Sequence, residues 1–96
     1  MFARILTRMR ELVRRRQYVM TTHADEETDA DGFDIFDIES AILTGEIVER
    51  QKERETAEWK YVIVGEAVDN RAIALVAKFG ASGRMLYILT VYGDER

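Results

Sequence analysis

The chain has 96 residues, enough for one folded domain spanning 1–96 and too few for two, and 47% of them are hydrophobic, enough for one core. It has no cysteine, so disulfides, thiol catalysis and cysteine-bound metals are excluded. The longest apolar runs, such as 72–77, are far shorter than the roughly 20 residues of a membrane-spanning helix. We therefore expect a cytoplasmic protein that does not bind a membrane.

The net charge of −4 is unevenly distributed along the chain. Residues 1–20 carry six arginines and one glutamate, a net +5, whereas residues 21–50 carry ten acids and one arginine, a net −9. The remaining residues, 51–96, sum to zero. Overall acidity disfavours a surface that wraps nucleic acid, because phosphate neutralisation supplies most of that affinity. A local basic groove remains open as an alternative.

The first segment, residues 2–17, has the apolar spacing of an amphipathic helix. Its inward residues recur at intervals of three and four: Phe2, Ile5, Leu6, Met9, Leu12 and Val13. The opposite side is basic and includes Arg4, Arg8, Arg14, Arg15 and Arg16. This basic side could bind phosphate or an acidic partner, or it could complement the acidic middle of its own chain.

Short elements follow the first helix. Residues 18–21 are extended in character, and a brief helical turn over 22–27 begins with a capping threonine. The sequence predicts a loop at 29–32, because aspartate and glycine favour turns. A second helix is expected over 34–44, and it ends at Gly45.

The hydrophobic period then changes to two, which predicts four strands, at 46–50, 59–66, 71–79 and 85–92. The last strand is apolar on both faces, so we expect it near the centre of the sheet. The stretch between the first two strands is expected to be a mobile loop or hairpin connection. The predicted fold class is α+β, with the N-terminal helices packed on one face of a four-stranded, mainly antiparallel sheet.

His23 is the single histidine of the chain. Histidine has the ordinary pKa, about 6.5, best suited to proton transfer near neutral pH, so His23 is the first candidate for a general acid or base. The alternative is a structural role, in which the imidazole caps or hydrogen-bonds a turn. The residues alone leave both interpretations open.

The acidic residues after His23 resemble part of a calcium-binding motif, but their spacing does not match the whole motif. Glu27, Asp29, Asp31 and Gly32 match the start of a calcium-binding helix–loop–helix motif, but Ile38 stands where the motif needs its bidentate glutamate. A solvated acidic turn is favoured, and we expect no metal and no other cofactor.

Aromatic residues are concentrated on the predicted strands: Trp59, Tyr61, Tyr87 and Tyr92. Such rings more often pack in the core or across strands than they serve as stacking platforms for nucleic-acid bases. Packing is therefore the favoured interpretation, with base stacking as the alternative.

Three separated motifs resemble one known family. They are Tyr18-Val-Met-Thr-Thr-His-Ala24, Asp37-Ile-Glu-Ser-Ala-Ile-Leu-Thr-Gly-Glu-Ile47 and Ile88-Leu-Thr-Val-Tyr92. Their order and content resemble the domain-of-unknown-function 4258 family (DUF4258). The resemblance assigns 18–93 to a family-like α+β domain and 1–17 to an N-terminal helix extension.

The resemblance implies a fold similar to the RelE/ParE-like toxins and, more widely, to small metal-independent ribonucleases. It also implies a partner antitoxin protein. It marks His23, Thr90 and Tyr92 as site residues. Two departures stand out. Many members continue after His-Ala with a basic helix, whereas this chain has acids at 25–29, and Gly93 replaces a common proline. The first departure removes positive charge where an RNA phosphate would need it.

Under this hypothesis, RNA cleavage uses His23 as base or acid and needs positive charge on the phosphate. Arg84, at the start of the last strand, is the expected catalytic cation, and Arg50 or Lys60 are expected to bind RNA phosphate. Thr90 and Tyr92 are two residues apart, so they point to the same face and could donate hydrogen bonds to phosphate oxygens.

Two function hypotheses follow from these observations. The first is a ribonuclease toxin that acts on RNA and is held by an antitoxin. The second is a non-catalytic protein-binding module of the same fold, which would use the basic face of the first helix or the acidic segment 25–39. Self-association is compatible with either hypothesis.

Overall fold

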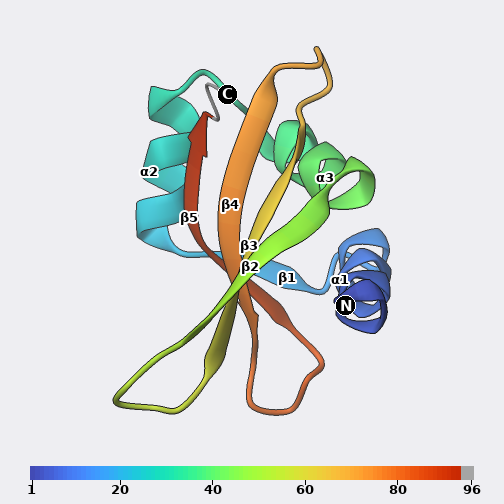
Figure 1. Ribbon diagram of the computed structural model, residues 1–96. Helices are drawn as coiled ribbons and strands as arrows, with labels where there is room; N and C mark the ends of the chain where they lie inside the picture. The colour runs from blue at the N-terminus through green and yellow to red at the C-terminus, as the bar shows by residue number, and fades with distance from the viewer. Residues whose placement is uncertain (94–96) are drawn as a thin grey trace.

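The computed structural model describes residues 1–93, which form three helices and a five-stranded mixed sheet (Figure 1). In chain order, the elements are α1 (Ala3–Arg14), β1 (Tyr18–Met20), α2 (Thr22–Ala30), α3 (Ile35–Thr44), β2 (Glu46–Lys52), β3 (Trp59–Glu66), β4 (Ala72–Phe79) and β5 (Leu86–Gly93). The α+β class is confirmed.

The sheet has five strands rather than the four predicted, in the order β1-β5-β4-β3-β2. The additional strand is β1, which pairs with β5 in parallel, whereas the other three neighbouring pairs are antiparallel. With only three residues, β1 is too short to show an alternating pattern. Its pairing with a distant strand therefore could not be read from the sequence.

The last strand, β5, lies near the centre of the sheet as predicted, between β1 and the central strand β4. Its two faces are nevertheless not equally buried. Ile88 and Val91 are fully buried, whereas Leu89 and Thr90 are only half-buried. A β-bulge between β4 and β5 contributes, because it shifts the pairing register near Leu89.

The helices are divided between one face of the sheet and one edge (Figure 1). The main contacts of α3 are with β3, and α1 packs against α3, whereas α2 lies along β5. Inward side chains such as Ile63 and Leu75 are fully buried beneath the helices. On the opposite face, Val62 and Val76 are half-buried, because no helix within residues 1–93 packs over them.

Two glycines allow α3 to lie directly against β3. A Cβ atom on Gly65 would be 2.1 Å from the carbonyl oxygen of Ala41, and one on Gly45 would be 2.4 Å from the same oxygen. Gly45 ends α3 as predicted, but its φ of −92° is open to any residue. The close approach of the two backbones, rather than a left-handed conformation, requires glycine at this position.

The remaining boundaries differ from the predictions by a few residues. The first helix ends at Arg14 rather than at 17, and Arg16 has a φ of 58° that turns the chain into β1. Thr21, not Thr22, caps α2, because the Thr21 hydroxyl accepts a hydrogen bond from the backbone N–H of Ala24. The helix continues to Ala30, through part of the predicted loop.

The segment after β2 forms more structure than the predicted mobile loop. Strand β2 extends to Lys52, and the N–H of Glu53 donates to the carbonyl of Glu58. Ala57 turns the chain with a φ of 57°. The connection is therefore a closed hairpin, the second of the two predicted alternatives.

Asp37 joins the start of α3 to the β3–β4 turn. One carboxylate oxygen accepts the N–H of Asp34, the helix cap, and the other accepts the N–H of Val68 at 2.9 Å. Asp37 is 8% exposed, so its removal would leave two donors poorly solvated.

We expect Asp37→Ala to lower the free energy of unfolding by about 2 kcal/mol in denaturant titration. An equal loss for the exposed control Glu55→Ala would contradict this role.

Tyr18 joins β1 to α3, because its hydroxyl donates a hydrogen bond to Glu39. Burial raises the pKa of Tyr18 above its ordinary value of 10.0, and the hydrogen bond and negative charge of Glu39 raise it further. A pKa raised on folding stabilises the protein fully below the unfolded pKa, and this stability is lost as pH rises through the folded pKa. We expect the stability advantage of the wild type over Tyr18→Phe to shrink as pH rises beyond about 10. Urea titrations at a series of pH values measure this difference, and a constant difference would contradict it.

Candidate functional site

The outer edge of β5 is only partly covered by a strand. Pairing with β1 ends at Ile88, and beyond this point α2 supplies the hydrogen-bond acceptors. The N–H of Val91 donates to Oε1 of Glu27 at 3.1 Å, and the N–H of Gly93 donates to Oδ2 of Asp31 at 3.3 Å. Glu27 and Asp31 are one helical turn apart, so α2 lies along this edge with two carboxylates facing it.

His23 lies one turn before Glu27 on the same side of α2. Its Nε2 atom is 3.3 Å from Oε1 of Glu27, the oxygen that also accepts from Val91. The imidazole side chain is nevertheless 68% exposed. A carboxylate that engages one ring nitrogen fixes the orientation of the ring and leaves the other nitrogen to a substrate.

Thr90 and Tyr92 flank Val91 and share the uncovered face of the sheet. Their cross-strand partners are Val76 and Ala74, which are two residues apart on β4, so both side chains are on one face. Tyr92 is 42% exposed. The structure therefore brings His23 and these two hydroxyl residues to neighbouring positions on α2 and β5.

The three predicted cations lie elsewhere. Arg84 is in the turn before β5, six residues from Thr90, which corresponds to about 20 Å along an extended strand. Lys60 is on β3, and Arg50 is on β2, where its guanidinium carbon is 4.0 Å from the centroid of the Trp59 ring. The structure does not group these cations with His23.

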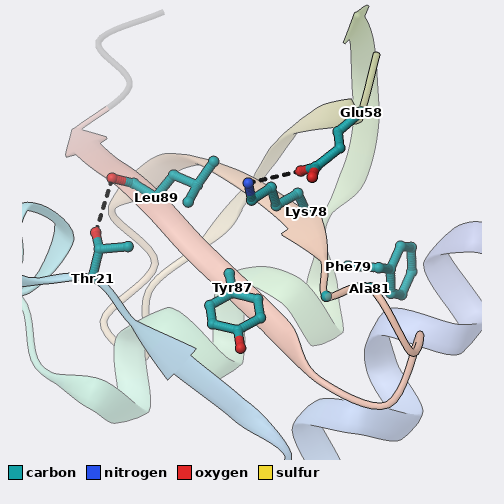
Figure 2. Close-up of a pocket in the computed structure, with 8 residues that line it drawn as sticks. Thr21, Glu58, Lys78, Phe79, Ala81, Tyr87 and Leu89 are labelled. Carbon is teal, nitrogen blue, oxygen red and sulfur yellow. Dashed lines mark hydrogen bonds and ion pairs between the residues drawn. The ribbon is translucent and has the colours of Figure 1, made fainter. Parts of the chain in front are cut away.

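A hollow of about 360 Å³ opens on the uncovered face of the sheet (Figure 2). We call it the open-face hollow. It is lined by Thr21, Glu58, Lys78, Phe79, Gly80, Ala81, Tyr87 and Leu89. Thr21 immediately precedes α2 and donates through its hydroxyl to the carbonyl of Leu89 at 3.3 Å. His23, Thr90 and Tyr92 are not among its lining residues, and Thr21 is two residues before His23 in the sequence.

Lys78 is the cation of this hollow, and the sequence analysis missed it. Its Nζ is 2.8 Å from Oε2 of Glu58, and this hydrogen bond raises the pKa of Lys78, although burial opposes the shift. Lys78 pairs with Tyr87 across the strands and is two positions from Val76, the partner of Thr90. A signal was present, since Lys78 is the one charged residue of an otherwise apolar strand.

The acidic segment has a backbone role in the structure. Glu27 and Asp31 accept hydrogen bonds from β5, and the segment predicted as a solvated acidic turn is partly helical. Within residues 1–93, no three histidine, aspartate or glutamate side chains are grouped closely enough to hold a metal ion.

Part of the basic side of the first helix also contacts backbone. Arg10 donates to the carbonyls of Ile42 and Gly45 at the end of α3. Arg8 donates to the carbonyl of Gly83 in the β4–β5 turn.

The helices of residues 1–93 are all too short or too polar to cross a lipid bilayer.

Glu27 is expected to stabilise the edge of β5 as well as to orient His23. Glu27→Ala leaves the N–H of Val91 without its acceptor, so we expect a loss of about 1.5 kcal/mol in the free energy of unfolding. Glu27→Gln keeps an acceptor oxygen and should lose less. Denaturant titration measures both, with the exposed neighbour Glu26→Ala as control. Equal stability of all three variants would contradict the edge contact.

Comparison with known proteins gives one match. The model of a family described as a domain of unknown function, DUF4258, matches residues 20–93, which include His23, Thr90 and Tyr92. No curated protein and no solved structure matches the chain significantly. Because the matched segment covers well over half of the sequence, this protein belongs to the DUF4258 family.

Proposed function

We propose that this protein is a small metal-independent ribonuclease with a RelE-like fold. The observation that carries the proposal is the pair of His23 and Glu27 at the exposed edge of β5. This pair lies beside two hydroxyl residues, Thr90 and Tyr92, on a sheet face that no helix within 1–93 covers. An oriented, solvent-accessible imidazole next to hydrogen-bond donors is what proton transfer at a phosphate requires.

The proposed reaction needs no group beyond the RNA and the protein. The ribose 2′-oxygen attacks the adjacent phosphorus, and the bond from phosphorus to the 5′-oxygen of the next nucleotide breaks. A base takes the proton of the 2′-hydroxyl, and an acid gives a proton to the leaving 5′-oxygen. The products are a 2′,3′-cyclic phosphate and a free 5′-hydroxyl. Catalysis therefore depends on proton transfer and on stabilising the charge of the phosphate oxygens.

We assign the proton transfer to His23, held by Glu27. Thr90 and Tyr92 donate hydrogen bonds to the phosphate oxygens, and Lys78 supplies positive charge on the same face when it exchanges its Glu58 partner for phosphate. We assign Arg84, Arg50 and Lys60 to phosphates of flanking nucleotides. A toxin requires a partner antitoxin that inhibits it. An antitoxin bound over the open face would block the same groups.

A specific observation favours the second function, a non-catalytic protein-binding module. Asp25, Glu26 and Asp29 are exposed on α2 close to His23 in sequence, and their charges repel RNA phosphate. The module would use this acidic surface to bind a basic segment of another protein. Normal growth during overexpression and no RNA binding at low salt would favour the module.

We expect His23→Ala to lower the rate of RNA cleavage at least about 100-fold, because a positioned acid or base contributes that much. The assay uses purified protein and single-stranded RNA in the presence of a metal chelator. Arg14→Ala, an exposed change on α1, is the control and should keep the wild-type rate. Circular dichroism checks that both variants are folded.

Lys78→Met and Arg84→Ala distinguish the two candidate cations. Lys78→Met should lower the cleavage rate strongly, whereas Arg84→Ala should change it only a few-fold. Undiminished cleavage by the His23 variant, or no cleavage by the wild type, would end the ribonuclease proposal.

A further inference from the structure

A second hollow, of about 260 Å³, has three aromatic residues among the seven that line it. We call it the aromatic hollow. It is lined by Ala57, Glu58, Trp59, Tyr61, Phe79, Gly80 and Ala81. The Tyr61 ring meets the Phe79 ring edge to face, with centroids 6.3 Å apart, and Tyr61 is only 6% exposed. Trp59 is 38% exposed and Arg50 lies over its ring, so a ligand can contact the part of the ring that Arg50 leaves uncovered.

Positive charge surrounds the exposed tryptophan. The guanidinium carbon of Arg50 is 4.0 Å from the centroid of the Trp59 ring, and Nζ of Lys52 is 5.5 Å from it. Both cations are on β2, and Lys52 is the direct cross-strand partner of Trp59. The one carboxylate of the lining, Glu58, is paired with Lys78 at 2.8 Å. An anionic ligand with a flat aromatic part matches this arrangement.

The two hollows adjoin. They share four lining residues, which are Glu58, Phe79, Gly80 and Ala81. Trp59 and Tyr61 are on the helix-facing side of the sheet, whereas Lys78 and Tyr87 are on its open face. A chain molecule that enters both hollows must therefore pass around the turn at Gly80 and Ala81, which lines both. The base of an unpaired nucleotide is flat and is linked to a phosphate, whereas bases in a duplex are already stacked and paired.

We propose that the aromatic hollow binds an unpaired base of single-stranded RNA by stacking on Trp59, with Arg50 and Lys52 contacting its phosphate. This base belongs to a nucleotide neighbouring the one in the open-face hollow. The inference rests on the proposed function in taking RNA as the ligand, and it specifies the substrate as single-stranded. Trp59 is a binding residue and does not touch the reacting atoms.

The sequence contains one tryptophan, so intrinsic fluorescence reports on Trp59 alone. The full chain with His23→Ala is titrated with a short single-stranded RNA and, separately, with the same sequence as a duplex. We expect the single strand to quench the fluorescence and the duplex to leave it unchanged. Equal responses to both RNAs, or no response to the single strand, would overturn the proposal.

The affinity measurement uses fluorescently labelled RNA in the same His23→Ala background. Base stacking is worth about 1–3 kcal/mol, so Trp59→Leu should weaken binding roughly 5- to 150-fold, while Trp59→Phe keeps most of the affinity. Phe36→Leu is the matched control, because Phe36 is an exposed aromatic residue on α3. Wild-type affinity for Trp59→Leu would overturn the stacking site.

Cleavage assays separate this proposal from the one on which it rests. In a chain with an intact His23, Trp59→Leu should raise KM and leave kcat unchanged. If the His23 variant cleaves RNA as fast as the wild type while Trp59 still controls binding, the catalytic proposal fails and the stacking site stands. If cleavage depends on His23 but KM does not depend on Trp59, the stacking site fails and the catalytic proposal stands.

Discussion

The contact between α2 and the free edge of β5 determines how the candidate site is arranged. A strand edge has unpaired N–H groups that must be hydrogen-bonded or solvated, and β1 is too short to cover this one. Glu27 and Asp31 accept the edge N–H groups, so the direction of α2 follows that of β5. His23, one turn before Glu27, is carried to the edge by the same geometry. The hydrogen bonds that satisfy the edge of the sheet thus also place the His23 imidazole beside it.

Sequence patterns predicted the fold class and most element types, since those depend on local periodicity and turn residues. The pairing of β1 was missed, because it depends on contacts between distant parts of the chain. Gly65 shows the same limit. Its role is to admit the carbonyl of Ala41 at a distance no side chain permits, and nothing near Gly65 in the sequence signals this contact.

The candidate site was predictable only in part. The spacing of Thr90 and Tyr92 indicates a shared face, and the resemblance singles out His23. The choice of cation could not be made from charge and strand position alone. Arg84 is in the turn before the strand that carries Thr90, whereas Lys78 belongs to the neighbouring strand and lies across from Tyr87. Cross-strand register decides which charge reaches a site, and register follows from the turn and the bulge between β4 and β5.

The parallel pairing of β1 with β5 also affects when the protein can fold. Tyr18 pairs with Leu86, and Thr21 with the backbone at Ile88, so the two halves of this contact are separated by most of the sequence. Contacts of such long separation form slowly, since a large loop must close first. A growing chain on the ribosome cannot complete them until β5 has left the exit tunnel. The imidazole and the hydroxyls therefore come together only after synthesis of the domain has finished, and translation intermediates lack the assembled site.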